Sequence, residues 1–465
     1  MLQLALRLHR ARQQDRKAAP VLAVDSRIDG RIQARFPFDF TPAQREVIAE
    51  IVADMAKPEP MNRLLQGDVG SGKTAVAIYA MLAAVACGHQ AAIMAPTELL
   101  ARQHMATLEQ LLAGSRIRLE LLVGGQTQAQ RRKALERIAA GESQIVVGTQ
   151  ALVSGTAKFK SLGLVVIDEQ HRFGVVQRAL LQQGETEPHV LLMTATPIPR
   201  TIAHAIHGDL EQSTIREGPA GRQPVLTYRV VPGQEDSWWE HVRKKLRDGR
   251  QGYVVVPAVE ESKKGLASIS SAFEELANGP LEAFRLGLVH GRLKSAEKQA
   301  IMADFRDRKL DVLVCTSVIE VGIDVPNATL MTILDAESFG LAQLHQLRGR
   351  VARGAVQGVC GAVTNSGDAA HPRVDAFVAS TDGFALADRD LQLRGPGELI
   401  GTRQSGKLDL YLADLKEHPE IVVEARRDAL DLFERDPKLA DVTLDRLKKL
   451  VVDRWGETLG LGQVG

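Results

Sequence analysis

The sequence has few cysteines, no long apolar run and almost no net charge. Its three cysteines, Cys87, Cys315 and Cys360, lie far apart, a spacing that suits neither a disulfide framework nor a metal site and favours a reducing cytoplasm. The apolar run at the start is too short for a signal peptide, and Arg7 interrupts it. No stretch approaches the length of a membrane span. The net charge of +1 means that any nucleic-acid-binding surface must be local.

The strongest positive signal is a glycine-rich stretch. Arg63–Gln66 predicts a short strand, Gly67–Thr74 reads G-x-x-x-x-G-K-T, and an alanine-rich helix follows until Gly88. Glycines let backbone amides approach a triphosphate, and the positive end of the helix faces the anion. Lys73 is placed to reach the β- and γ-phosphates, and the Thr74 hydroxyl to bind Mg²⁺. We expect a nucleotide-binding loop rather than a solvated turn, formed by Gly67, Asp68, Val69, Gly70, Ser71, Gly72, Lys73 and Thr74.

A helix is predicted just upstream of this loop. Thr41 and Pro42 have the residue types of an N-cap and a first turn, and the helix should run to Met55. The aromatic cluster Phe36–Phe40 and Gln44 could hold an adenine, because the base is flat and a glutamine amide can pair with its polar edge. Ordinary core packing is the alternative for these residues.

A pair of acids supplies the second half of a hydrolytic site. Asp168 and Glu169 directly follow the apolar strand Leu164–Ile167. At the end of a strand, one carboxylate can hold Mg²⁺ and its neighbour can orient and deprotonate the attacking water. Two unrelated surface acids are the alternative, which the nearby phosphate loop disfavours.

A second α/β unit begins near Pro224 and has no phosphate loop of its own. Two sheets with one nucleotide loop imply a site shared at the interface between domains. After Gln346, arginines follow at positions 348, 350 and 353, and a guanidinium from a second domain can neutralise charge on a transferring phosphoryl group. The alternative is a basic helix that either binds no ligand or binds nucleic acid.

Seven segments together resemble the motor of superfamily-two helicases: QGDVGSGKT, APTELLARQH, VVIDEQHRFG, MTATPIPRT, VHGRLK, VIEVGIDVPNA and QLHQLRGRVARG. The DEQH form, IPRT after TATP and above all Gly383–Gly406 resemble the RecG family of ATP-dependent DNA translocases, which remodel stalled forks and recombination junctions. This resemblance implies an α/β fold of two tandem RecA-like P-loop NTPase lobes with a C-terminal helical and loop translocation segment. The expected bounds are a helical linker at 1–35, lobe 1 at 36–222, lobe 2 at 223–382 and the C-terminal segment at 383–465.

The resemblance also implies roles for individual residues. ATP and Mg²⁺ are the implied cofactors, with Lys73, Asp168, Glu169, Arg350 and Arg353 catalytic and Thr74 and Asp168 at the metal. Further nucleotide contacts are implied for Gln44, Gly322 and Asp324. Nucleic-acid backbone contacts are implied for Thr97, Thr149, His290 and Thr316. Coupling of hydrolysis to motion is implied for Thr194, Thr196, Arg394, Arg403 and Gln404.

Some features depart from the RecG pattern. Gln150 stands where the family usually has histidine, and Ala352 where it has glycine. Only about 35 residues precede Phe36, too few for the oligonucleotide-fold wedge of that family. We therefore expect a RecG-type motor without its wedge, acting as a cytoplasmic monomer on double-stranded and branched DNA. Three alternatives stay open: a catalytically weak DNA-binding fragment, a transcription-repair-coupling translocase and, less favoured, an RNA helicase.

Overall fold

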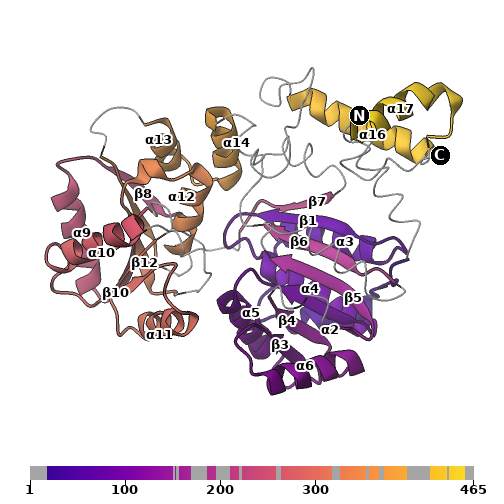
Figure 1. The fold of residues 1–465 in the computed structure, drawn as a ribbon, viewed down its shortest axis with the longest axis horizontal. Coiled ribbons are helices and arrows are strands. Elements are labelled where there is room, and N and C mark those ends of the chain that lie inside the picture. Colours follow the sequence, from indigo (N-terminus) through magenta and orange to yellow (C-terminus); the bar gives the residue numbers. More distant parts are fainter. Residues whose placement is uncertain are drawn as a thin grey trace.

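The computed structural model describes residues 18–149, 152, 157–168, 186–194, 210–218, 223–257, 263–316, 325–351, 356–365, 371–394, 419–436 and 439–455. These residues form two α/β lobes that lie side by side, followed by C-terminal helices (Figure 1). Every strand pairing among them is parallel. The predicted fold class of two tandem RecA-like lobes is confirmed. No helix within the described ranges is long and apolar enough to cross a membrane.

Lobe 1 is built on a seven-stranded sheet in the order β3-β4-β2-β5-β6-β1-β7. Its strands are β1 (Asn62–Gly67), β2 (Gln90–Met94), β3 (Leu119–Leu122), β4 (Ile145–Gly148), β5 (Leu162–Asp168), β6 (His189–Thr194) and β7 (Glu211–Ile215). Strands β1, β2, β4 and β6 are buried along their whole lengths. Helices that cover both faces of a parallel sheet explain this burial, which in β1 extends to the polar residues Asn62, Arg63 and Gln66.

The helices in the described part of lobe 1 are α2 (Ser26–Gln33), α3 (Pro42–Met55), α4 (Lys73–Ala86), α5 (Glu98–Leu111) and α6 (Gln128–Ala140). Helix α3 begins as predicted, because the Thr41 side chain accepts from Gln44 N and the Gln44 side chain accepts from Thr41 N. Helix α4 packs on β2 and β5, and its residues from Val76 to Ala84 are all buried. The small alanine side chains allow this close approach.

The chain ahead of α2 is fixed to lobe 1 by backbone hydrogen bonds. Ala19 N donates to Pro58 O at 2.7 Å, and Leu22 N donates to Met55 O at 2.8 Å. The fully buried His189 holds the same segment, because its Nε2 lies 2.8 Å from Pro20 O while its Nδ1 accepts from Met61 N. Nδ1 is therefore the unprotonated nitrogen of a neutral ring.

Lobe 2 is built on a six-stranded sheet in the order β10-β11-β9-β12-β13-β8. Its strands are β8 (Leu226–Val230), β9 (Gln251–Val255), β10 (Leu286–Val289), β11 (Val312–Cys315), β12 (Ala328–Ile333) and β13 (Val359–Val363). Its helical elements are α9 (Glu235–Arg247), α10 (Lys263–Ala277), α11 (Ser295–Arg306), η4 (Ala336–Ser338), α12 (Leu341–Arg348) and η5 (Gly349–Val351). Strand β13 completes the sheet between β12 and β8, and no strand follows it among the described residues.

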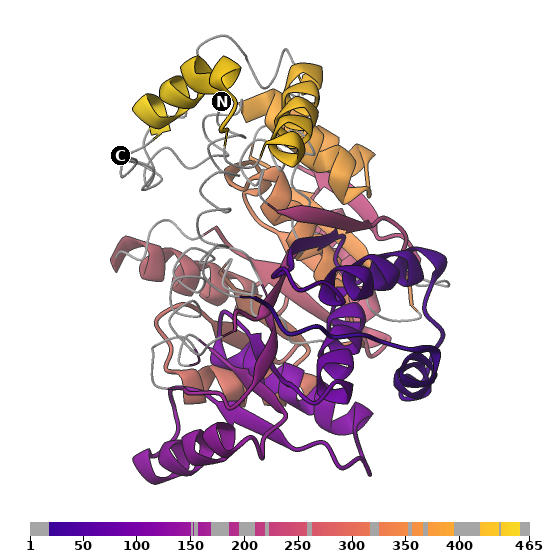
Figure 2. The same ribbon diagram turned by 90° about the vertical axis from the view of Figure 1, so that its right-hand side faces the viewer.

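The C-terminal part starts on lobe 2. Its helical elements are α13 (Pro372–Ala379), α14 (Gly383–Arg394), α16 (Pro419–Arg435), η6 (Val442–Leu444) and α17 (Asp445–Trp455). Helix α14 packs on α12 and α13, and both views place α16 and α17 beyond the sheets, at the top (Figures 1 and 2). The expected helical start of Gly383–Gly406 is thus present as α14. The rest of that segment after Arg394, and residues 1–17 of the expected helical linker, lie outside the described residues.

Candidate functional site

The glycine-rich loop joins β1 to α4, as expected. Gly70 and Gly72 have φ angles of +78° and +89°, a left-handed backbone that favours glycine. Position 72 also has no room for a side chain, because a Cβ atom there would overlap Nε2 of Gln44. Helix α4 starts directly after Gly72 without a side-chain cap. Its first amides are therefore free of a capping side chain at the positive end of the helix, where an anion is stabilised.

Lys73 and Asp68 bond to the loop itself. The Lys73 Nζ donates to the carbonyl oxygens of Gly67, at 2.7 Å, and Asp68, at 2.9 Å. The backbone N–H of Val69 donates to Oδ1 of Asp68 at 2.6 Å. The lysine ammonium thus lies within the curve of the loop, which is where a phosphate-binding lysine is needed.

Gln44 supports the loop from α3. Its Nε2 donates to Ser71 O at 2.9 Å, its Oε1 accepts from Thr41 N at 3.0 Å, and the residue is 2% exposed. Both ends of the amide are therefore bonded within lobe 1. The structure brings Gln44 to the loop, as expected, and its predicted contact with adenine would require these bonds to be exchanged.

The predicted metal carboxylate has a partner that the sequence reasoning missed. Asp168 is the last residue of β5, and its Oδ2 lies 2.8 Å from Nε2 of His104 on α5. His104 ends the segment APTELLARQH, which we used only as a family motif. The signal that could have found it is a histidine at the helical spacing of buried Ala101 and Leu108. The neighbouring Glu169 lies outside the described residues.

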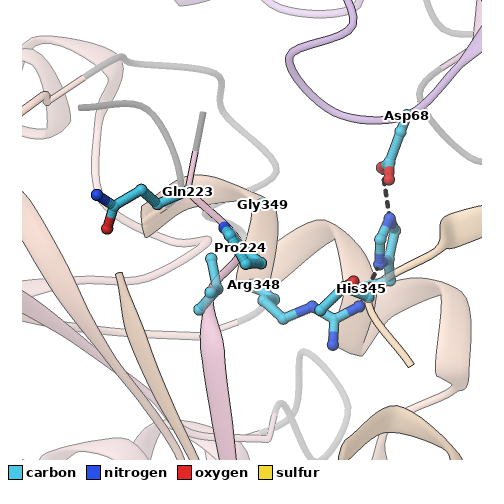
Figure 3. Close-up of a pocket in the computed structure, with 8 residues that line it drawn as sticks. Asp68, Gln223, Pro224, His345, Arg348 and Gly349 are labelled. Carbon is cyan, nitrogen blue, oxygen red and sulfur yellow. Dashed lines mark hydrogen bonds and ion pairs between the residues drawn. The ribbon is translucent and has the colours of Figure 1, made fainter. Parts of the chain in front are cut away.

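Lobe 2 meets the glycine-rich loop through α12 and the turn after it. Nε2 of His345 lies 2.5 Å from Oδ1 of Asp68 (Figure 3). Gly349 lies against Val69, since a Cβ atom built on it would be 2.7 to 2.9 Å from three Val69 side-chain carbons. The expected interface between the lobes therefore exists at the loop, and the sequence reasoning named neither His345 nor Gly349 as part of it.

Arg348 anchors His345 from within lobe 2. Its Nη2 donates to Nδ1 of His345 at 2.8 Å, and its Nη1 donates to the carbonyl oxygens of Phe377, at 2.9 Å, and Ser380, at 2.7 Å. The guanidinium also lies 4.6 Å from the centre of the Phe377 ring. Burial lowers the pKa of Arg348 from its ordinary value, yet an arginine still only donates. Nδ1 of His345 is therefore an acceptor, and Nε2 carries the proton that is donated to Asp68.

A cavity of about 220 Å³ adjoins this contact (Figure 3). Its lining residues come from the loop, from the start of lobe 2 and from α12 and its neighbours: Asp68, Gln223, Pro224, Val225, His345, Arg348, Gly349 and Thr381. Arg350, a predicted finger, lies in η5 next to this cavity wall. The other predicted finger, Arg353, and the predicted nucleotide contacts Gly322 and Asp324 lie outside the described residues.

The residues expected to contact a nucleic-acid backbone follow neighbouring strands. Thr97 follows β2 and Thr149 follows β4, and these two strands pair in lobe 1. Thr97 is the N-cap of α5, where its hydroxyl accepts from Leu100 N at 3.4 Å. In lobe 2, His290 follows β10 and Thr316 follows β11, and Val289 pairs with Cys315 just before them.

His290 and Thr316 each carry a buried polar atom at the end of their strands. Within the described part of the chain, neither His290 Nδ1 nor Thr316 Oγ1 has a hydrogen-bond partner. Burial also lowers the pKa of His290, which favours its neutral ring. Buried polar atoms in native proteins are bonded to protein, to ordered water or to a ligand.

The residues expected to couple hydrolysis to motion are only partly described. Thr194 is the buried last residue of β6, the strand between β1 and β5. Arg394 is the last residue of α14. Thr196, Arg403 and Gln404 lie outside the described residues.

Three family descriptions match the chain in succession. They are "DEAD/DEAH box helicase" over residues 41–205, "Helicase conserved C-terminal domain" over 239–355 and "ATP-dependent DNA helicase RecG, domain 3, C-terminal" over 380–452. The chain is 47% identical over 463 residues to the ATP-dependent DNA helicase RecG of Synechocystis sp., covering 99% of this chain and 55% of that protein. The chain is similar to RecG proteins over almost its whole length.

Other RecG proteins match in the same way. The RecG of Aquifex aeolicus is 42% identical over 475 residues, which cover all of this chain and 59% of that protein. A solved structure of RecG bound to a three-way DNA junction superposes with a TM-score of 0.76 at 40% identity, covering 90% of this chain and 55% of that one. The chain thus spans somewhat more than half the length of the RecG proteins that it matches.

Structures outside the RecG family share the fold alone. Yeast Dbp5 bound to RNA and ADP BeF3 superposes with a TM-score of 0.55 at 18% identity, covering 79% of this chain and 93% of that one.

Proposed function

We propose that this chain is an ATP-driven, double-stranded-DNA translocase motor of the RecG type, which remodels stalled replication forks and recombination junctions. One observation carries the proposal: the glycine-rich loop of lobe 1 contacts His345 and Gly349 of lobe 2. A loop that touches the second lobe allows nucleotide turnover to change how the lobes sit together. When the lobes then separate along the DNA, the motor would move forward on the duplex.

The hydrolytic roles rest on the loop and on Asp168. Lys73 would hold the β- and γ-phosphates, and Glu169 would orient the attacking water. The donors present suit Mg²⁺, because Thr74 lies in the first turn of α4 and Asp168 offers a carboxylate whose other oxygen is held by His104. Bound there, Mg²⁺ would neutralise charge on the phosphates. Arg350 and Arg353 would contribute positive charge from lobe 2.

The DNA roles rest on both lobes. Thr97 and Thr149 in lobe 1, and His290 and Thr316 in lobe 2, would contact phosphates of the backbone without reading sequence. Arg102 of α5 and Arg306 of α11 line a second cavity, of about 420 Å³, between the lobes. Two arginines there add local positive charge to a chain of net charge +1.

The remaining assignments complete the proposal. Gln44, Gly322 and Asp324 would contact the nucleotide, and Arg394, Arg403 and Gln404 would pass lobe motion to the duplex. The bounds expected from the sequence, 36–222 and 223–382 for the lobes and 383–465 for the translocation segment, are kept. We place this motor in the cytoplasm, where it would act as a monomer on double-stranded and branched DNA.

ATP hydrolysis measured with and without duplex and forked DNA tests this function. We expect hydrolysis that duplex DNA stimulates and that Lys73→Ala abolishes. A folded chain that binds DNA without turnover would contradict the motor and favour a DNA-binding fragment. Stronger stimulation by single-stranded RNA would favour an RNA helicase instead.

A further inference from the structure

His104 is a polar residue in an otherwise apolar stripe. The buried positions of α5 are Ala101, His104 and Leu108, which lie on one face of the helix. An imidazole placed in such a stripe is stable only if its nitrogens find hydrogen-bond partners. The His104 side chain is 9% exposed, and its Nε2 meets the Asp168 carboxylate at 2.8 Å. The histidine is thus aimed at the carboxyl edge of the sheet.

The order of the strands explains why α5 reaches Asp168. Helix α5 follows β2, and β2 pairs with β5 so that Met94 is opposite Ile167. Asp168 is the next residue of β5 and is opposite Met193 of β6. Helix α5 packs on β3 and β4, on the other side of β2 from β5, and the His104 side chain in its second turn reaches across to Asp168 at the end of β5.

The hydrogen bond has a defined direction. An ionised carboxylate can only accept, so Nε2 of His104 carries the proton and donates it to Oδ2. Holding one oxygen restricts rotation of the carboxylate about the Cβ–Cγ bond, and Oδ1 is then presented in one direction. Removing a group that orients a metal ligand in this way commonly lowers the affinity of the site for the metal.

We propose that His104 is a positioning residue for the metal-binding carboxylate of the motor, an inference that rests on the proposed ATP hydrolysis. By donating to Oδ2 it fixes the carboxylate so that Oδ1 of Asp168 would be available to hold Mg²⁺. His104 would act through Asp168 and not as a ligand itself. An ordinary core histidine, which would serve only the packing of α5, is the alternative that the experiment must separate.

The test measures metal affinity rather than turnover. Binding of a fluorescent, non-hydrolysable ATP analogue to the full chain is followed while Mg²⁺ is titrated, and again in EDTA. We expect His104→Ala to raise the half-saturating Mg²⁺ concentration about tenfold and to leave binding in EDTA unchanged. His104→Gln, whose amide N–H can reach the position of Nε2, should recover most of the affinity.

A matched variant controls for packing. Leu108→Val loosens the same face of α5 one turn away without touching Asp168, and it should lower the melting temperature while leaving the Mg²⁺ requirement unchanged. The inference is overturned if His104→Ala shows the wild-type Mg²⁺ requirement, or if Leu108→Val shifts that requirement equally. Failure of the proposed function would look different, because the wild-type chain would then show no Mg²⁺-dependent binding of the analogue.

Discussion

Replacing His345 tests whether the loop contact holds the lobes together. His345→Phe keeps a ring of similar size and removes both hydrogen bonds, to Asp68 and from Arg348. A hydrogen bond to a charged group contributes about 1.5–3 kcal/mol. The Asp68 side chain is 30% exposed, so solvent screening reduces this to about 1–2 kcal/mol. That energy corresponds to a roughly 5- to 30-fold change in an equilibrium constant.

The assay is energy transfer between dyes on the two lobes. Cys315 and Cys360 are buried, so once the half-buried Cys87 is changed to serine, cysteines introduced at Glu136 and Arg247 accept the dyes. Without nucleotide, His345→Phe should shift the population toward separated lobes by roughly 5- to 30-fold. His345→Gln, which can still donate to Asp68, should stay near the wild type. Identical distributions for His345→Phe and the wild type would refute the reasoning.

Three further predictions concern the glycine-rich loop, the proposed DNA contact of Thr316 and the pH dependence of stability. Gly72→Ala should weaken nucleotide binding in a filter assay by about tenfold or more, since strain of about 1–3 kcal/mol falls on the loop. The control is Gly88→Ala, because Gly88 also has a positive φ of +85° but open space around it. Equal effects of the two variants on nucleotide binding would contradict the loop's geometry. Thr316→Val should weaken duplex binding about fivefold, because a hydrogen bond of about 1 kcal/mol is lost. The control Thr329→Val in β12 should bind duplex as the wild type does. Equal affinities of the two variants in DNA titrations would argue against a phosphate contact at Thr316. Burial lowers the pKa of His189 below its ordinary 6.5. Its contribution to stability is therefore complete above pH 6.5 and declines as the pH falls toward the folded-state pKa, by up to about 1.4 kcal/mol per pH unit. In His189→Gln the melting temperature should depend less on pH between pH 7.5 and 5.5, and an unchanged pH dependence would exclude this histidine as its cause.

The central strands and the loop could be predicted from the sequence because their signals are local. Strands β2, β4, β5 and β6 each contain a continuous apolar run, and the glycine pattern specifies its own turn. The edge strands β7 and β8 were missed, since each has exposed positions that interrupt such a run. Strand β13 contains Gly361, and a glycine inside a strand weakens the local strand signal. The ring of Trp238 occupies the space beside Gly361, so glycine is required there for packing.

The long-range contacts of the site could not be predicted. His104 and Asp168 are 64 residues apart, and His345 and Asp68 are 277 apart. No periodicity or motif spacing connects residues at such separations: the fold of lobe 1 brings the first pair together, and the contact between the lobes brings the second pair together. The arginine pattern after Gln346 was recognised as charge directed at the nucleotide. Within it, Arg348 is 3% exposed and bonds to Phe377 and Ser380, so it serves the structure of lobe 2.

The central claim is that this chain converts ATP turnover into movement along duplex DNA. Its most direct test is displacement of a triplex-forming oligonucleotide from a duplex, measured on a gel with the chain in excess. We expect displacement that requires ATP and is lost in Lys73→Ala. DNA-stimulated ATP hydrolysis without any displacement would contradict the claim.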